Sequence, residues 1–307
     1  MTEREQRILT EVSELSKMDD SLYQFYQKKA GEKLQVRQDR LGAVSCQSGK
    51  IVPRILILFR ACPAGVMVIR KKKEKEAGEK GHEVTLLGHT EPEALYDSMC
   101  CYKGREVGVL RKNDKDSYIL EEFPDTSFNI GEICEFQQGV ICKSNKLYGF
   151  NLSASISCCI MSFCITELTQ SEKYINFTLI NEALAGENGY IEAVQRVKPD
   201  FTLLVSLIPD QETCRAGRGP AIAIKDGNGV VSAETRRRLA SAAEDIPVQW
   251  FIGKTDRVLE LISTAGTKSD FGEICVPVRF PGHRNEEIIW DDVEKTQNLL
   301  LKILSQL

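Results

Sequence analysis

Short apolar runs alternate with longer amphipathic stretches along most of the chain. Residues 54–59 contain an unbroken apolar run, Ile-Leu-Ile-Leu-Phe, which is typical of a strand buried on both faces. Similar runs predict further strands, at residues 65–69, 174–180, 201–208, 220–224, 248–252 and 273–277. Helical spacing or length predicts helices at residues 5–17, 21–31, 153–168, 191–197, 232–243 and 291–307. This alternation predicts an α/β fold whose helices cover both faces of a sheet.

The middle of the chain has a different pattern. A dense run of mixed charges, Arg70 to Lys80, predicts a solvated loop rather than a basic docking patch. Short strand-like pieces follow, separated by Gly, Asn and Asp, at residues 84–87, 107–110, 117–120 and 133–136. The pattern predicts a small β domain at 71–145, inserted into an α/β domain made of residues 1–70 and 146–307.

Composition limits the classes of partner. The chain has 307 residues, 42% of them hydrophobic and 27% charged, and its net charge of −4 gives no reason to expect a nucleic-acid partner. The first residues lack a secretory signal, and the longest apolar stretch, 154–165, is shorter than the roughly 20 residues that span a bilayer. We therefore expect a cytoplasmic protein without a membrane partner.

Eleven cysteines are scattered along the chain, and none forms a C-x-x-C pair. This spacing argues against zinc ribbons and thioredoxin-type sites. An odd number without a signal peptide also argues against a disulfide framework. We expect free thiols that are mostly buried in the core.

Several short motifs occur in a fixed order along the chain. They are Gly65-Val-Met-Val68, Asn129-Ile-Gly-Glu132, Gly186-Glu-Asn-Gly189, Pro199-Asp200, Gly217-Arg-Gly-Pro-Ala-Ile222 with Asp226-Gly227, Gly253-Lys-Thr-Asp256, Val276-Pro-Val-Arg-Phe280, Glu286 and Asp291-Asp-Val293. In this order the chain resembles the glutamyl aminopeptidase/endoglucanase-like family of cytosolic dinuclear metallo-aminopeptidases, which form tetrahedral particles. The resemblance implies a mixed-sheet aminopeptidase-like domain, an inserted PDZ-like β-barrel and a homo-oligomer.

The resemblance also implies a site for two divalent ions, zinc or cobalt, held by two histidines and three carboxylates beside a glutamate base. The family's ligand and base positions fall here on Arg60, Asn151, Ala183, Leu184, Ser206 and Gly282. Arginine does not ligate cations, and Ala, Leu and Gly carry no donor. We therefore expect a degenerate site without a metal cofactor. We then expect an aminopeptidase-like, non-catalytic protein without metal chemistry. It either binds a peptide in the old substrate cleft or serves as a subunit of an oligomer, with copies of itself or with a family member.

One alternative is an active metal-dependent aminopeptidase that releases N-terminal residues from peptides through an altered site. Glu182, Asp256 and His283 are its residual candidates. Each has a simpler explanation: an exposed carboxylate for Glu182, a turn or helix cap for Asp256, and a loop position for His283.

Another alternative is cysteine catalysis, for which Cys62 is the best candidate because it falls on the expected cleft. A thiol nucleophile needs a base, yet His82 and His89 fall in the inserted region. Cys158 and Cys159 lie on an apolar helix, where packing is the expected role.

Arg60 has two candidate roles. Its guanidinium could bind a carboxylate or phosphate ligand, or it could pair with an internal acid such as Glu182 or Asp256. The internal pair is favoured, since a buried unpaired guanidinium is costly.

Overall fold

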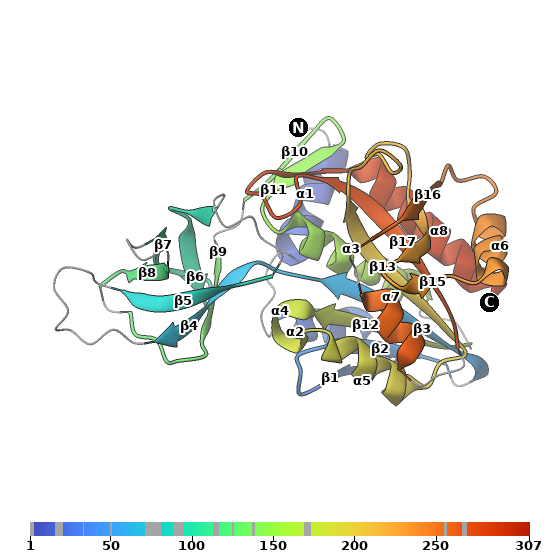
Figure 1. Ribbon diagram of the computed structural model, residues 1–307, viewed down its shortest axis with the longest axis horizontal. Coiled ribbons are helices and arrows are strands. Elements are labelled where there is room, and N and C mark those ends of the chain that lie inside the picture. The colour runs from blue at the N-terminus through green and yellow to red at the C-terminus, as the bar shows by residue number, and fades with distance from the viewer. Residues whose placement is uncertain are drawn as a thin grey trace.

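The computed structural model describes residues 3–15, 21–32, 34–49, 51–70, 81–88, 95–112, 117–124, 126–136, 139–168, 173–254, 257–265 and 269–307. Figure 1 shows a large α/β domain and a smaller β lobe that projects from one side of it. No helix in the described ranges is long and apolar enough to cross a membrane.

A large mixed sheet forms the centre of the α/β domain. Its strand order is β1-β2-β12-β3-β13-β17-β18-β11-β10, and β14 pairs with β17, β15 and β16. The four central strands, β12, β3, β13 and β17, run parallel. The bounds are β1 Gln35–Gln38, β2 Val44–Ser48, β3 Ile51–Ala61, β10 Val140–Lys143, β11 Lys146–Gly149, β12 Lys173–Asn181, β13 Phe201–Pro209, β14 Ala221–Asp226, β15 Gly229–Val230, β16 Gln249–Ile252, β17 Asp270–Arg279 and β18 Glu286–Ile289.

Helices cover both faces of this sheet, as predicted. One face carries α1 Glu3–Leu15, α2 Ser21–Ala30, α3 Leu152–Leu168, α6 Ala233–Ala242 and α8 Trp290–Gln306. The other carries α4 Glu182–Ala185, α5 Asn188–Val197 and α7 Val258–Thr264. Strand β3 shows why its apolar run is unbroken: Ile57 and Phe59 pack under α3, while Leu56 and Leu58 face α5.

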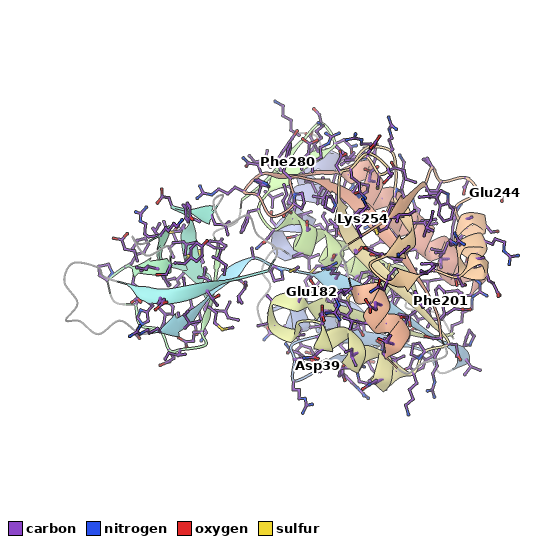
Figure 2. The ribbon with its side chains drawn as sticks, in the orientation of Figure 1. Asp39, Glu182, Phe201, Glu244, Lys254 and Phe280 are labelled. Atoms are coloured by element: carbon purple, nitrogen blue, oxygen red, sulfur yellow. The ribbon has the colours of Figure 1, made fainter. Side chains whose placement is uncertain are left out.

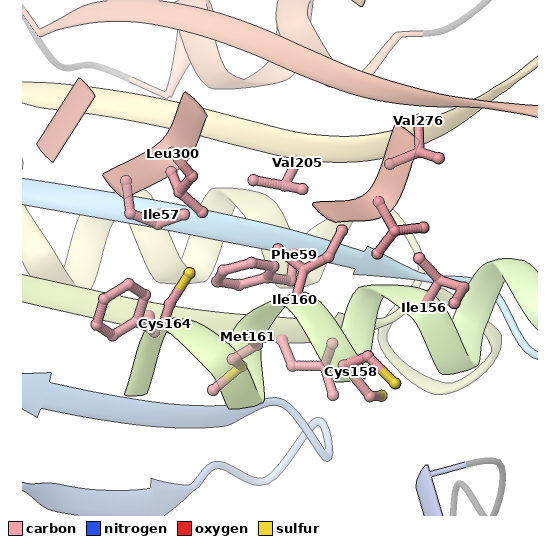
Figure 3. Close-up of a cluster of buried hydrophobic side chains, with 14 of the residues drawn as sticks. Ile57, Phe59, Ile156, Cys158, Ile160, Met161, Cys164, Val205, Val276 and Leu300 are labelled. Carbon is pink, nitrogen blue, oxygen red and sulfur yellow. The ribbon is translucent and has the colours of Figure 1, made fainter. Parts of the chain in front are cut away.

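Helix α3 is apolar on all sides because it lies between the sheet and the α1–α2 pair. Figure 3 shows Cys158 and Cys164 among the aliphatic side chains of this core. All eleven cysteines are free thiols and eight are buried, which confirms packing as the role of Cys158 and Cys159.

The smaller lobe is a closed antiparallel barrel with the strand order β4-β5-β8-β7-β6-β9. Its strands are β4 Gly65–Arg70, β5 His82–Leu87, β6 Met99–Tyr102, β7 Arg105–Lys112, β8 Tyr118–Glu122 and β9 Ile133–Phe136. Buried side chains such as Val66, Leu120 and Phe128 fill its interior. The inserted small β-barrel is therefore confirmed.

Strand pairing differs from the expected domain limits at both ends of the insertion. Strand β4 pairs inside the barrel, although residues 65–70 were assigned to the α/β domain. Strand β10 pairs with β11 in the large sheet, although 140–143 were assigned to the insertion. Only three residues, 62–64, separate β3 from β4, so two apolar runs of different domains look continuous in sequence. The charge run after Arg70 lies outside the described residues.

Candidate functional site

The carboxyl ends of the parallel strands meet at one edge of the large sheet, where open α/β sheets usually bind ligands. A pocket of about 580 Å³ opens there. Its lining includes Arg60 of β3, Cys62 of the linker that follows β3, the end of β13, and the segment that follows β16. Figure 2 labels Glu182 and Lys254, which lie on this side of the domain.

Arg60 stands one residue before the end of β3 and pairs with Glu182 at the start of α4. The Arg60 Nε to Glu182 Oε1 distance is 3.0 Å, and the two side chains are only 16% and 11% exposed. The Tyr190 hydroxyl of α5 donates to the same Glu182 oxygen at 2.7 Å. The internal pair favoured for Arg60 is thus confirmed, and the expectation that Glu182 is a surface carboxylate is wrong.

Electrostatics keep Arg60 charged in this position. Burial opposes the charge, but Tyr190, Glu182 and Cys62 outweigh it and raise the pKa of the guanidinium. Burial also raises the pKa of the Tyr190 hydroxyl, and the charge of Glu182 adds to the rise. Tyr190 is therefore a neutral hydrogen-bond donor to an ion pair.

Glu273 of β17 is a buried acid that the sequence analysis did not single out. Its side chain is 1% exposed, and Oε1 accepts a hydrogen bond from the Ser206 hydroxyl at 2.6 Å. Oε2 has no hydrogen-bond partner among the described residues. Burial raises the pKa of Glu273 to about 7, with Ser206 and Arg60 opposing and nearby Asp226 adding to the rise.

Asp226 ends β14 and forms part of the pocket wall. It is 4% exposed, and burial raises its pKa although Gly227 N donates to it at 2.8 Å and Arg60 lies nearby. A Cβ on Gly253 would fall 2.0 Å from the Asp226 Oδ1 atom, so glycine makes room for this carboxyl group.

Both acids left a signal in the sequence. Glu273 directly precedes the apolar run Ile274-Cys-Val-Pro-Val278. Asp226 comes two residues after the apolar run 221–224 and directly before a glycine. An acid that interrupts a strand buried on both faces has to find a partner inside the fold. Both residues are accordingly buried in the fold.

Asn151 and Gly282 occupy expected ligand positions, but their hydrogen bonds serve to hold main-chain segments in place. Asn151, with φ of +58°, accepts from Ala64 N at 2.8 Å and donates to Ala64 O at 3.1 Å, which ties α3 to the linker between β3 and β4. Gly282 has no side-chain donor, and its N–H donates to Glu286 Oε1 at 2.8 Å.

Ala183 and Leu184 lie in α4, where the family's paired glutamates were expected. They line a second pocket of about 500 Å³ between α4 and the barrel. The Leu184 side chain is 51% exposed. Neither residue offers an oxygen or nitrogen atom from its side chain.

Two of the residual candidates lie in different places. Glu182 pairs with Arg60, whereas His283 is exposed and lines a separate hollow with Tyr148 and Phe280, its ring 6.3 Å from the Phe280 ring. Cys62 does line the Arg60 pocket. Asp256 and His89 lie outside the described residues. His82 belongs to the barrel, where it pairs with Glu122.

The described donors do not fit a pair of divalent ions. Within the described ranges, no group of three or more His, Cys, Asp or Glu side chains could hold a metal ion. A dinuclear site needs several anionic or imidazole ligands around each ion, whereas Arg60 places a fixed positive charge among the remaining acids.

The sheet, the inserted barrel and the edge pocket together define an aminopeptidase-type α/β protein. Residues 119–299 match the M42 glutamyl aminopeptidase family, and the chain belongs to that family. A curated protein of Acetivibrio thermocellus, provisionally named an aminopeptidase, is 25% identical over 188 residues, which cover 57% of this chain and 56% of that protein. The chain thus spans little more than half the length of this relative.

Solved structures agree on the fold. The TET aminopeptidase of the marine sediment archaeon Thaumarchaeota archaeon SCGC AB-539-E09 is 15% identical with a TM-score of 0.80, covering 92% of this chain and 90% of that one. The TET1 peptidase of Pyrococcus horikoshii, described as assembling into a tetrahedron or a large octahedral shell, is 15% identical with a TM-score of 0.78, covering 92% of each chain.

Proposed function

We propose that this M42 family member does not hydrolyse peptides with a metal pair and instead binds a peptide ligand in the pocket at the sheet edge. The observation that carries the proposal is the Arg60–Glu182 ion pair, which stands where the family's first ligand position falls. Three further positions, Ala183, Leu184 and Gly282, have no donor side chain.

The chemistry of two-metal hydrolysis supports this proposal. The ions lower the pKa of a bound water and polarise the scissile carbonyl. A guanidinium paired with a carboxylate does not lower the pKa of a water molecule as a metal ion does. It also offers no coordination site for the scissile carbonyl. Among the described residues at this position, no group makes a nucleophile from water in the way that the family implies.

The pocket itself supports a binding role. Its volume of about 580 Å³ falls within the ~300–1,000 Å³ typical of ligand sites. Apolar side chains from β13, β16 and β17 line it beside a few polar groups, as in other ligand pockets: Leu207, Ile208, Phe251, Ile252 and Val278.

A homo-oligomer in the cytoplasm is part of the same proposal. It is supported by the similar TET1 peptidase, which is described as forming a tetrahedron or an octahedral shell. A second similar TET1 structure is described as a dodecamer. A family member with intact ligands is the alternative partner in such an assembly.

Metal content and turnover, measured on one sample, test the proposal. The protein is purified with added zinc and cobalt, analysed by elemental mass spectrometry, and assayed with a panel of aminoacyl anilides. We expect neither bound metal nor turnover. About two ions per chain together with turnover would overturn the proposal.

An active enzyme with an altered site is the second candidate, and one observation favours it. Glu182, Asp226 and Glu273 all keep carboxyl groups close to Arg60. If turnover appears, the Asp226→Asn variant should abolish it. A thiol route through Cys62 predicts instead that iodoacetamide removes the turnover and that Cys62→Ser abolishes it.

A further inference from the structure

Four ionisable side chains from four elements gather at the pocket and are here called the Arg60 cluster. Its members are Arg60 of β3, Glu182 of α4, Asp226 of β14 and Glu273 of β17. Arg60 contacts Glu182 directly, and its charge lowers the pKa of both Asp226 and Glu273 against the effect of burial. One guanidinium therefore acts on all three carboxyl groups.

The position of Arg60 is fixed by contacts that do not involve its charge. Its carbonyl oxygen accepts a hydrogen bond from the Ser157 hydroxyl of α3 at 2.5 Å. In the parallel ladder, Arg60 stands opposite Ile180 of β12, two residues before Glu182. Tyr190, 0% exposed, donates a hydrogen bond to the same Glu182 oxygen that Arg60 contacts and so holds this carboxylate in place. The cation is thus built into the strand ends.

Carboxyl groups gathered in a buried place repel each other and lose hydration, so they need a compensating positive charge. The chain belongs to the M42 family, and its resemblance to that family implies that two metal ions supply this positive charge. The described donors here do not fit two such ions. We infer that the Arg60 guanidinium is an internal cation that takes the place of the metal ions and holds the strand ends around the pocket together.

This inference goes beyond the proposed ligand binding, because it concerns what stabilises the strand ends around the pocket. It makes a specific chemical claim: removal of the Arg60 side chain leaves a cavity that accepts a free guanidinium ion. A planar guanidinium forms paired hydrogen bonds with a carboxylate that an ammonium ion does not reproduce. Rescue by small cations therefore distinguishes a guanidinium site from ordinary packing.

The test compares melting temperatures of the full chain. Loss of one partner from a buried pair predicts that Arg60→Ala melts about 6 to 10 °C lower. Millimolar ethylguanidinium should recover several degrees in this variant, ethylammonium should recover less, and neither should shift the unmodified protein. Arg54→Ala is the matched control, because Arg54 lies exposed on the same strand with its guanidinium over the Tyr174 ring.

A second pair of variants covers the case in which Arg60→Ala does not fold. Arg60→Lys keeps the charge without the planar fork, and we expect a smaller loss of melting temperature. Glu182→Gln combined with Arg60→Lys should lose less than the sum of the single changes, because the two residues interact directly.

Two results would overturn the inference. One is an equal response of Arg60→Ala and Arg54→Ala to ethylguanidinium, and the other is strict additivity of the Arg60 and Glu182 variants. Either result leaves the proposed function intact if the unmodified protein carries no metal. Conversely, a failure to bind peptides with the rescue still observed would overturn only the proposed function.

Discussion

Two buried carboxyl groups in the large domain, those of Asp292 and Glu273, differ in how their charge is satisfied. Asp292, in the first turn of α8, is 0% exposed and accepts hydrogen bonds from Gly217 N at 2.5 Å and Gly219 N at 2.8 Å. Glu273 has the Ser206 hydroxyl on one oxygen and no partner on the other among the described residues. The first carboxylate is bound by the main chain, and the second depends on side chains.

The difference lies in how far each carboxyl group depends on the side chains around it. Main-chain donors remain whatever side chains the loop carries, provided that the loop keeps its shape. Gly219 keeps that shape, since its φ is +93° and a Cβ there would lie 2.0 Å from Pro247 O. The negative charges of the acids in the Arg60 cluster are compensated by other side chains. A substitution of any one of these side chains therefore changes the surroundings of the acids.

The largest effect is expected for Asp292→Ala. The change leaves the N–H groups of Gly217 and Gly219 without their acceptor, and we expect a loss of about 4 kcal/mol in the free energy of unfolding. Urea unfolding measures this loss. Asp291→Ala is the matched control on the same turn, because Asp291 is 47% exposed and should lose less than 1 kcal/mol. Equal losses would show that the loop does not depend on the buried carboxylate.

Glu273→Gln tests the other carboxyl group through pH. The pKa of Glu273 is raised by burial to about 7, above the ~4.5 of an exposed glutamate, so the folded state keeps a proton that the unfolded state has lost. The free energy of unfolding should therefore fall as pH rises from about 4.5 to 7, by about 3 kcal/mol from this group, and change no further above pH 7.

The variant should show a correspondingly smaller fall across the same range, measured by urea unfolding at pH 4.5, 6 and 8. Burial also raises the pKa values of Asp226, Glu286 and Asp292, so a part of the slope should remain. Identical slopes in the variant and the unmodified protein would mean that Glu273 is ionised throughout.

Gly253→Ala should have a smaller effect, confined to the pocket. The added methyl group would meet the Asp226 carboxyl group at 2.0 Å, and we expect a loss of about 2 kcal/mol as the two groups move apart. Gly139→Ala is the control, because a Cβ there meets no atom within 4 Å. Thermal unfolding compares the two variants, and similar melting temperatures would count against a tight Asp226–Gly253 contact.

The sequence predicted the parts of the fold that have long apolar signals. The two-sided strand β3, the buried helix α3 and a small inserted β domain were expected from periodicity and spacing, and the family resemblance implied that this domain is a barrel. Seven short strands were not: β1, β2, β6, β10, β11, β15 and β18. Most of these are only partly buried, as in β1 and β10, so alternation over four residues gives too little signal.

The site was predicted less completely, because charge partners are far apart in sequence. Arg60 was recognised through the motif count, and the cost of an unpaired guanidinium predicted an internal acid as its partner, Glu182 or Asp256. The structure shows that the partner is Glu182. The contribution of Asp226 and Glu273 depends on β14 and β17 lying side by side near β3, which no local pattern shows. His283 was misleading in the opposite way, since its neighbour Gly282 aligns with a ligand position while the imidazole lines another hollow.

The smallest effect is expected for Arg4→Ala, which completes the comparison between compensated charges. Arg4 of α1 contacts Asp291 at 2.9 Å and Glu294 at 2.8 Å, yet its side chain is 49% exposed. Water and salt screen such a pair, so the loss in the free energy of unfolding should stay below about 1 kcal/mol and shrink further at 0.5 M salt. Arg60→Lys, measured in parallel, should instead lose stability at every salt concentration, because its partner Glu182 is only 11% exposed. If the two variants show the same salt dependence, the Arg60 cluster is hydrated rather than buried, and its carboxyl groups need no internal cation.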